Sequence, residues 1–113
     1  MIDQIQPVQL QDWIVAQAPY GPTVVLDVRE PWEVQTACVT AQGFELIKIV
    51  MHTLPARLQD LNRDQPIACL CHHGARSMQV ASFLAQQGFS HVANITGGIH
   101  AWSSQVDAAV PTY

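Results

Sequence analysis

Residues 70–77, Leu-Cys-His-His-Gly-Ala-Arg-Ser, connect a predicted buried strand to a predicted helix. The strand signal is the apolar run 67–70, which ends directly before Cys71. The residues that follow repeat at helical spacing and place Val80 and Leu84 on one face. Cys71 is therefore expected in a tight strand-to-helix turn.

A turn of this kind suits a nucleophilic thiolate, because free backbone N–H groups and the positive end of the helix dipole stabilise an anion there. Gly74 lets the backbone curl, Arg76 adds a forked cation, and Ser77 offers a hydroxyl at the helix start. The sequence thus predicts Cys71 as the catalytic nucleophile. The predicted substrate-binding loop consists of His72, His73, Gly74, Ala75, Arg76 and Ser77.

Three segments carry a resemblance to a known family. The pattern Cys-x-x-Gly-x-Arg-Ser at 71–77, after an apolar strand, resembles the active-site loop of the rhodanese-like sulfurtransferases. Residues 26–33, Leu-Asp-Val-Arg-Glu-Pro-Trp-Glu, resemble the first signature of that family. Residues 97–102, Gly-Gly-Ile-His-Ala-Trp, resemble its closing signature. The resemblance spans nearly the whole chain and is closest to the small single-domain bacterial thiosulfate sulfurtransferases.

Strand and helix signals alternate along the chain, which predicts an α/β fold with an open parallel sheet of about five strands and helices on both faces. The resemblance implies the same rhodanese-like architecture. Strands are expected at 2–5, 23–26, 67–70 and 91–95, whereas 45–50 alternates too poorly for a firm assignment. Helices are expected from Pro7 past Ile14, at 31–37, around 54–61, from 76 to Gly88 and at 98–104, before an irregular tail at 106–113.

Size and composition indicate one domain over residues 1–113, since 49% hydrophobic residues supply a single core. Charged residues make up only 12% of the chain and the net charge is -4, which argues against nucleic acid or an anionic membrane as a partner. No apolar run approaches the roughly 20 residues that span a bilayer. The first four residues lack the layout of a signal peptide, so a cytoplasmic location is expected.

The chain has three cysteines, an odd number, and free thiols are the expectation. Cys69 is expected as a small core residue, whereas the sequence does not place Cys38. Cys69 and Cys71 with His72 and His73 are too closely spaced for the usual zinc patterns, so we expect neither a metal nor another cofactor.

Ligands of open α/β sheets bind at the carboxyl ends of the strands, where Asp27 and Cys71 are both expected. Asp27 and Arg29 are interpreted as supporting residues that fix loops through paired hydrogen bonds, in preference to a chemical role. Gly97 and Gly98 predict a tight turn before the last helix, with Trp102 in the core. The sequence leaves the roles of His72 and His73 open. They either tune the charge of the nucleophile or shape the mouth of the pocket, or they are solvated loop residues whose backbone N–H groups matter.

The resemblance implies a two-step sulfur transfer. The Cys71 thiolate attacks the outer sulfur of a donor such as thiosulfate, sulfite leaves, and a persulfide remains. Cyanide, a small thiol or a protein thiol then removes the sulfur. The loop N–H groups and Arg76 are expected to stabilise negative charge during both steps.

Two other functions stay open at this point. Cysteine phosphatases and arsenate reductases also surround an anion with cysteine and arginine, but their loops have five residues between the two, against four between Cys71 and Arg76. A non-catalytic regulatory module is the other alternative. The stretch 36–44 departs from the family pattern, with Cys38 near the usual place of a histidine. A second hypothesis, less favoured, is that Cys38 resolves the persulfide through a disulfide.

Overall fold

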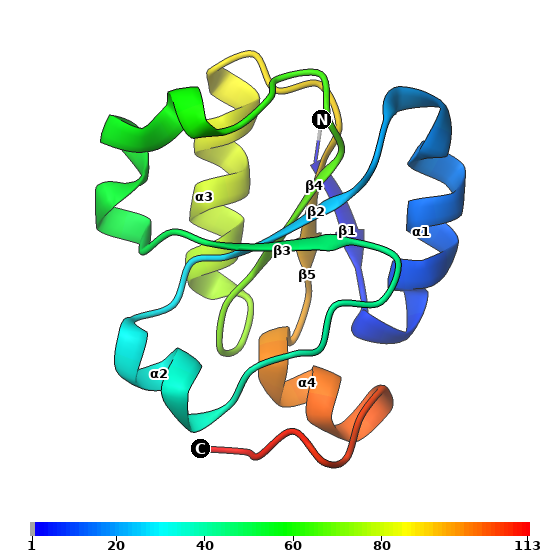
Figure 1. The fold of residues 1–113 in the computed structure, drawn as a ribbon, viewed down its shortest axis with the longest axis vertical. Helices are drawn as coiled ribbons and strands as arrows, with labels where there is room; N and C mark the ends of the chain where they lie inside the picture. Colours follow the sequence, from blue (N-terminus) through cyan, green and yellow to red (C-terminus); the bar gives the residue numbers. More distant parts are fainter. Residues whose placement is uncertain (1) are drawn as a thin grey trace.

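The computed structural model describes residues 2–113 and places a five-stranded parallel sheet between two layers of helices (Figure 1). The order across the sheet is β1-β5-β4-β2-β3, and all neighbouring strands are parallel. The predicted α/β class with an open parallel sheet is confirmed. The strands are β1 (Ile2–Ile5), β2 (Val24–Asp27), β3 (Glu45–Lys48), β4 (Ile67–Leu70) and β5 (Val92–Ile95).

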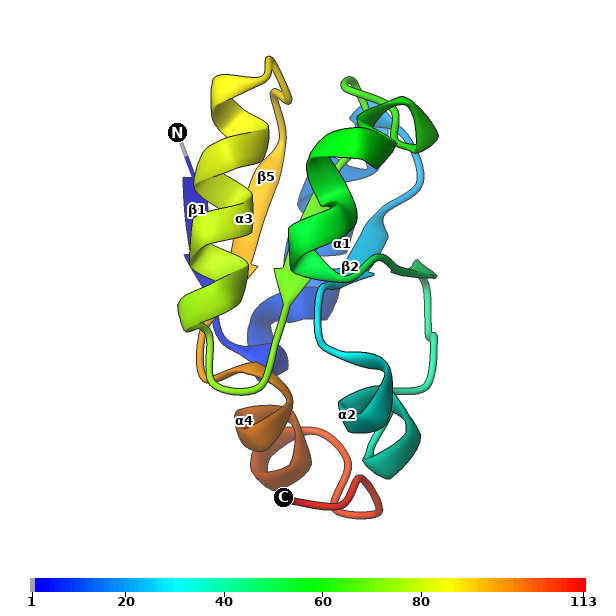
Figure 2. The same cartoon turned by 90° about the vertical axis from the view of Figure 1, so that its left-hand side faces the viewer.

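Helices cover both faces of the sheet. Helix α3 (Ala75–Gln86) and the 3-10 helix η3 (Met51–Asp60) lie side by side on one face, with α1 (Leu10–Gln17) behind the sheet (Figure 2). Helix α4 (Gly98–Gln105) packs with α1 into the second core, through Ile99 and Trp102. The remaining short elements are α2 (Pro31–Thr36), η1 (Pro7–Gln9) and η2 (Ala18–Tyr20).

Strand β4, at the centre of the sheet, is apolar at every position. Ile67 and Cys69 pack into the core beneath α3 and η3, while Ala68 and Leu70 face the opposite core. All four are fully buried. Successive strand residues point to opposite faces, and both faces are covered, so every position of β4 is apolar. The strand ends where Cys71 begins the loop to α3.

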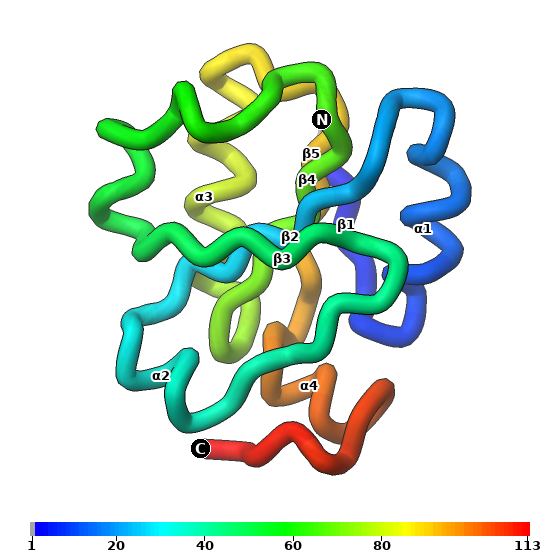
Figure 3. Tube along the Cα trace, viewed as in Figure 1, coloured from blue at the N-terminus to red at the C-terminus, as the bar shows by residue number. Residues whose placement is uncertain are grey.

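The structure differs from the sequence expectations mainly at the sheet edge. β3 pairs only with β2 and its residues are half-buried or exposed, which explains the weak pattern in 45–50. The helix expected around 54–61 is a 3-10 helix with Pro55 inside it. The tail after α4 is irregular, as expected, and its end returns to lie beside α2 (Figure 3). The Tyr113 hydroxyl donates a hydrogen bond to Glu33 of α2. Across residues 2–113, none of the helices has the length and apolar character needed to cross a bilayer.

Candidate active site

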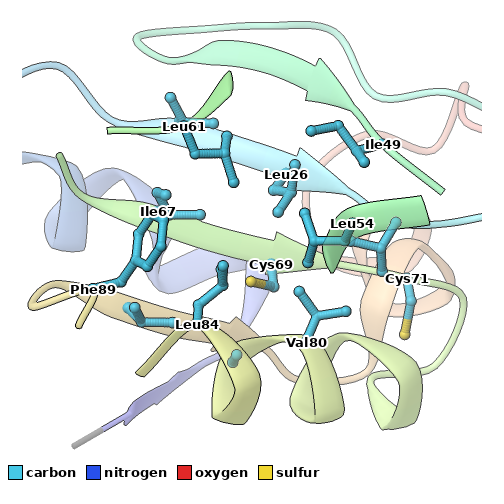
Figure 4. Packing of buried hydrophobic residues seen from close by; sticks show 14 residues of the cluster. Leu26, Ile49, Leu54, Leu61, Ile67, Cys69, Cys71, Val80, Leu84 and Phe89 are labelled. Atoms are coloured by element: carbon cyan, nitrogen blue, oxygen red, sulfur yellow. The ribbon is translucent and has the colours of Figure 1, made fainter. Parts of the chain in front are cut away.

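Cys71 lies at the carboxyl end of β4, directly before the loop that leads into α3. Its side chain is at one end of the buried cluster, next to the first turn of α3, and the residue is only 1% exposed (Figure 4). The sulfur accepts a hydrogen bond from the backbone N–H of Gly74 at 3.1 Å and donates to the hydroxyl of Ser77 at 3.2 Å. The site therefore holds a buried thiol between one amide and one hydroxyl.

Helix α4 holds the loop in this shape. The N–H of Ile99 donates to the carbonyl of Cys71 at 2.8 Å, and the N–H of His100 donates to the carbonyl of His72 at 3.1 Å. These are donors of the first helical turn, which have no partner within their own helix. Gly98 makes the approach possible, because a Cβ on it would lie 2.4 Å from the carbonyl oxygen of His72. The tight turn that Gly98 predicts is confirmed.

Gly74 sits where the loop turns into α3. Its φ is 107°, a conformation that side chains other than glycine rarely adopt. A Cβ there would lie 3.2 Å from the backbone nitrogen of Gly97. The curl expected at this glycine therefore both aims its N–H at the Cys71 sulfur and keeps two loops in close contact.

A chain of buried polar groups leads away from the thiol. Ser77 donates its hydroxyl proton to Oδ1 of Asn94 at 2.6 Å, and the Asn94 amide donates to Oε1 of Gln4 at 3.0 Å. Asn94 lies on β5 and is 4% exposed. It orients the serine that contacts Cys71. Sequence reasoning missed Asn94, because it is a polar residue in an otherwise apolar strand and has no local partner.

Ser77→Ala is expected to reduce stability by about 1 to 3 kcal/mol, because it leaves the buried Oδ1 of Asn94 without a donor. In an Asn94→Ala background the same substitution should cost much less, since that acceptor is already gone. Urea unfolding of the wild type, both single variants and the double variant measures this coupling. Strictly additive losses would show that the two side chains do not act as a unit.

Arg76 is paired with Glu33. Its two terminal nitrogens donate to the two carboxylate oxygens, each at 2.7 Å. The hydrogen bonds from Arg76 lower the pKa of Glu33 to about 2 against the opposing effect of burial, and they raise the pKa of Arg76. The Arg76 guanidinium expected beside the nucleophile is present, but both of its terminal nitrogens are bound to Glu33. Glu33 is part of the quoted 26–33 motif, yet sequence reasoning gave it no role.

The Glu33–Arg76 pair predicts a specific acid sensitivity. A carboxylate whose pKa falls from its ordinary 4.5 to about 2 on folding contributes stability that is fully present above 4.5 and lost as the pH falls toward 2. Between about pH 5 and pH 3 the wild type should therefore lose about 1 to 2 kcal/mol more than Glu33→Gln. Urea unfolding at the two pH values checks this. Equal losses in the two proteins would contradict it.

Asp27 and Arg29 form a buried ion pair, consistent with their interpretation as supporting residues. Arg29 donates through Nε and Nη2 to the two Asp27 oxygens at 2.9 and 2.7 Å. It also donates to the carbonyl of Ala37 and to the hydroxyl of Tyr113. Burial opposes the charge of Arg29, but the bonds to Asp27 and Tyr113 outweigh it and raise its pKa. The pair ties the loop after β2 to α2 and the tail.

His72 and His73 differ in their surroundings. The His72 ring is stacked between the rings of His73 and Tyr113, each at 3.9 Å between centroids. Burial and the neighbouring His73 lower the pKa of His72, so it is neutral near pH 7. His73 is exposed. His73 thus fits the solvated role, whereas His72 is packed between two rings beside the nucleophile. Tyr113 gave no sequence signal, and His100 is part of the quoted 97–102 motif but was given no role, since only the fold brings the two residues to the loop.

The other two cysteines are free thiols, as expected. Cys69 is fully buried in the core, and burial together with nearby Cys71 raises its pKa. Cys38 is partly exposed and its thiol donates to the carbonyl of Val39 at 3.4 Å. Within residues 2–113 no cysteine is joined to another.

A family model for the rhodanese-like domain matches residues 10–105. The chain belongs to this family. A sulfurtransferase of Allochromatium vinosum is 35% identical over 82 residues, which are 71% of each chain. A chloroplastic rhodanese-like and PpiC domain-containing protein of Arabidopsis thaliana is 43% identical over 91 residues, 79% of this chain but only 30% of that longer protein. The crystal structure of a rhodanese-like domain protein from Staphylococcus aureus has a TM-score of 0.75 at 24% identity, with 99% of both chains covered, and shows the same fold.

Membership in the rhodanese-like family agrees with the architecture described above. The matched region starts in α1 and ends with α4, so it contains the β4 loop and both flanking motifs. Sulfur transfer is supported at the level of the family, and the relative from Allochromatium vinosum is a sulfurtransferase.

Proposed function

We propose that this rhodanese-like protein moves a sulfane sulfur from thiosulfate or a similar donor to a thiophilic acceptor, through a persulfide on Cys71. The observation that carries the proposal is the Cys71 thiol held between the Gly74 N–H and the Ser77 hydroxyl at the start of α3. An amide and a helix start stabilise a thiolate there and an anionic sulfur bound to it. The similarity to a sulfurtransferase supports the same chemistry.

The reaction has two displacements. After the thiol releases its proton to solvent, the Cys71 sulfur attacks the outer sulfur of thiosulfate, a sulfur–sulfur bond forms, and the electron pair of the broken bond leaves with sulfite. A cyanide or thiolate acceptor then attacks the outer persulfide sulfur, and the pair of that bond returns to Cys71. Over the cycle one sulfur atom passes from the donor to the acceptor and Cys71 returns to its starting state, so the scheme requires no cofactor.

The residues around Cys71 have separate tasks in this scheme. The Gly74 N–H donates a hydrogen bond to the sulfur. The Ser77 hydroxyl accepts a hydrogen bond from the thiol until the thiol loses its proton. Arg76 contributes a positive charge at the start of α3, and this charge is paired with the Glu33 carboxylate. Since Cys71 is only 1% exposed, a donor must present its sulfur end-on, as thiosulfate does. The acceptor is a small molecule or the thiol of a protein.

The persulfide itself tests this function. Native protein treated with thiosulfate is expected to gain the mass of one sulfur atom, located on the peptide that contains Cys71, and to lose it when cyanide is added. Cys38→Ser, which keeps the loop intact, should gain the same mass. An unchanged mass, or a sulfur found only on Cys38, would contradict the proposal.

A parallel assay with an aryl phosphate separates sulfur transfer from phosphatase activity. The loop has one residue fewer than a phosphatase loop, and Glu33 occupies the arginine fork that a phosphate dianion requires. We expect no phosphate release. Phosphate release without persulfide formation would favour the phosphatase alternative, and inactivity toward both compounds would favour a regulatory module.

A further inference from the structure

Three histidines meet beside the active-site loop. His72 and His73 follow the nucleophile in the chain, and His100 lies in the first turn of α4. The hydrogen bond from the His100 N–H to the His72 carbonyl, at 3.1 Å, sets the distance between the two backbones. One potential ligand nitrogen from each ring lies within 4.8 Å of the other two. The cluster thus joins two segments that are far apart in the sequence.

The His72 ring is the fixed member of this cluster. It is stacked between His73 and Tyr113, and its Nε2 is buried without a hydrogen-bond partner among residues 2–113. A buried nitrogen in this situation has lost its solvation and gained nothing in return, which a bound cation would correct. His73 and His100 are exposed, so solvent leaves room for their rings to turn.

We propose that His72, His73 and His100 bind a divalent first-row transition metal ion, with Zn²⁺ as the representative. Imidazole nitrogen suits Zn²⁺, Ni²⁺ and Cu²⁺, whereas Mg²⁺ and Ca²⁺ require oxygen ligands that this cluster lacks. Three protein ligands leave the fourth tetrahedral position to a water molecule. The proposal concerns binding and is independent of the sulfur-transfer reaction.

The geometry requires a small rearrangement. Metal–nitrogen bonds of about 2.0 to 2.1 Å place tetrahedral ligands about 3.4 Å apart, and the three nitrogens, which lie within 4.8 Å of one another, must reach that spacing. Because the His72 and His73 rings are stacked, the lone pairs of their nitrogens lie in nearly parallel planes and do not point at one metal ion. His73, which is tilted by 26° from His72, therefore has to rotate out of the stack. Its exposure allows that movement at the cost of one ring contact.

The test is a titration of the protein, free of any affinity tag, with zinc chloride by isothermal calorimetry. One ion per chain is expected to bind. His100→Gln removes one ligand from an exposed position and should weaken the affinity at least about tenfold. The chain has five histidines, and the two outside the cluster provide matched controls. His52→Gln and His91→Gln should bind zinc as the wild type does.

A cysteine thiolate also binds zinc, so Cys71→Ala completes the set. The proposal requires that Cys71→Ala keeps the zinc affinity while His100→Gln loses it. The reverse result would show that the ion is held by the nucleophile and would overturn the proposal. Equal affinities in all the histidine variants, or no binding to the wild type, would overturn it as well.

Discussion

Cys71→Ala is expected to lower thiosulfate-dependent thiocyanate formation by at least about a thousandfold, because no persulfide can form without the nucleophile. No other thiol replaces it easily. Cys69 is fully buried and its pKa is raised by that burial, and Cys38 lies in the stretch between α2 and β3. Initial rates with thiosulfate and cyanide, measured with the two proteins side by side, check this expectation.

Cys38→Ser is the matched control for the nucleophile, because it removes a thiol without touching the loop. Its rate and the lifetime of its persulfide should equal those of the wild type. A persulfide that survives longer in Cys38→Ser would show that Cys38 resolves it, in line with the less favoured hypothesis. A Cys71→Ala rate within tenfold of the wild type would remove Cys71 from the mechanism.

Gly98→Ala should have the largest effect on the fold around the site. Its φ is 59°, and the new Cβ would lie within 2.5 Å of the backbone carbonyl oxygens of Cys71 and His72. Backbone atoms cannot turn aside as a flexible side chain does, so α4 and the active-site loop must separate. Left-handed strain of about 1 to 2 kcal/mol and overpacking of about 1 to 3 kcal/mol together predict a loss of about 3 kcal/mol. Chemical denaturation measures it.

Gly43→Ala separates the clash from the backbone strain. Gly43 also has a positive φ, of 77°, but a Cβ there meets only the side-chain oxygen of Gln11 at 3.4 Å. Its substitution should cost only about 1 to 2 kcal/mol and leave sulfur transfer unchanged. Gly98→Ala should lose sulfur transfer in addition, since it displaces the carbonyls that α4 holds. Equal losses in the two variants would mean that the contact between α4 and the loop does not matter.

The sequence was sufficient for four of the five strands and for the place of Cys71 at the end of one of them. Runs such as 67–70 are apolar at every position, which is typical of a parallel strand covered on both faces, and the structure places β4 there. The turns at Gly74 and Gly98 could be predicted because residues other than glycine rarely adopt a positive φ. The edge strand β3 was much harder to recognise. It pairs with β2 only and its residues are half-buried or exposed, so its pattern carries little information.

The partners of the site residues were not predictable in the same way. Arg76 was expected to face an anion, and the structure shows that Glu33 occupies its guanidinium. Asn94 reaches Ser77 from β5, and Tyr113 stacks on His72 from the end of the chain. These contacts join residues between 17 and 43 positions apart. No local pattern marks them.

The amino-acid sequence alone determined the α/β class, the strand that carries Cys71 and the loop that follows it, because hydrophobic periodicity and glycine conformation are local properties of the chain. The tertiary structure decided what surrounds the thiol. Only the packing of α4, α2 and the tail at the carboxyl ends of the strands brings Glu33, His100 and Tyr113 to the loop. Charge pairing and ring stacking depend on distances in space, which spacing along the chain does not specify.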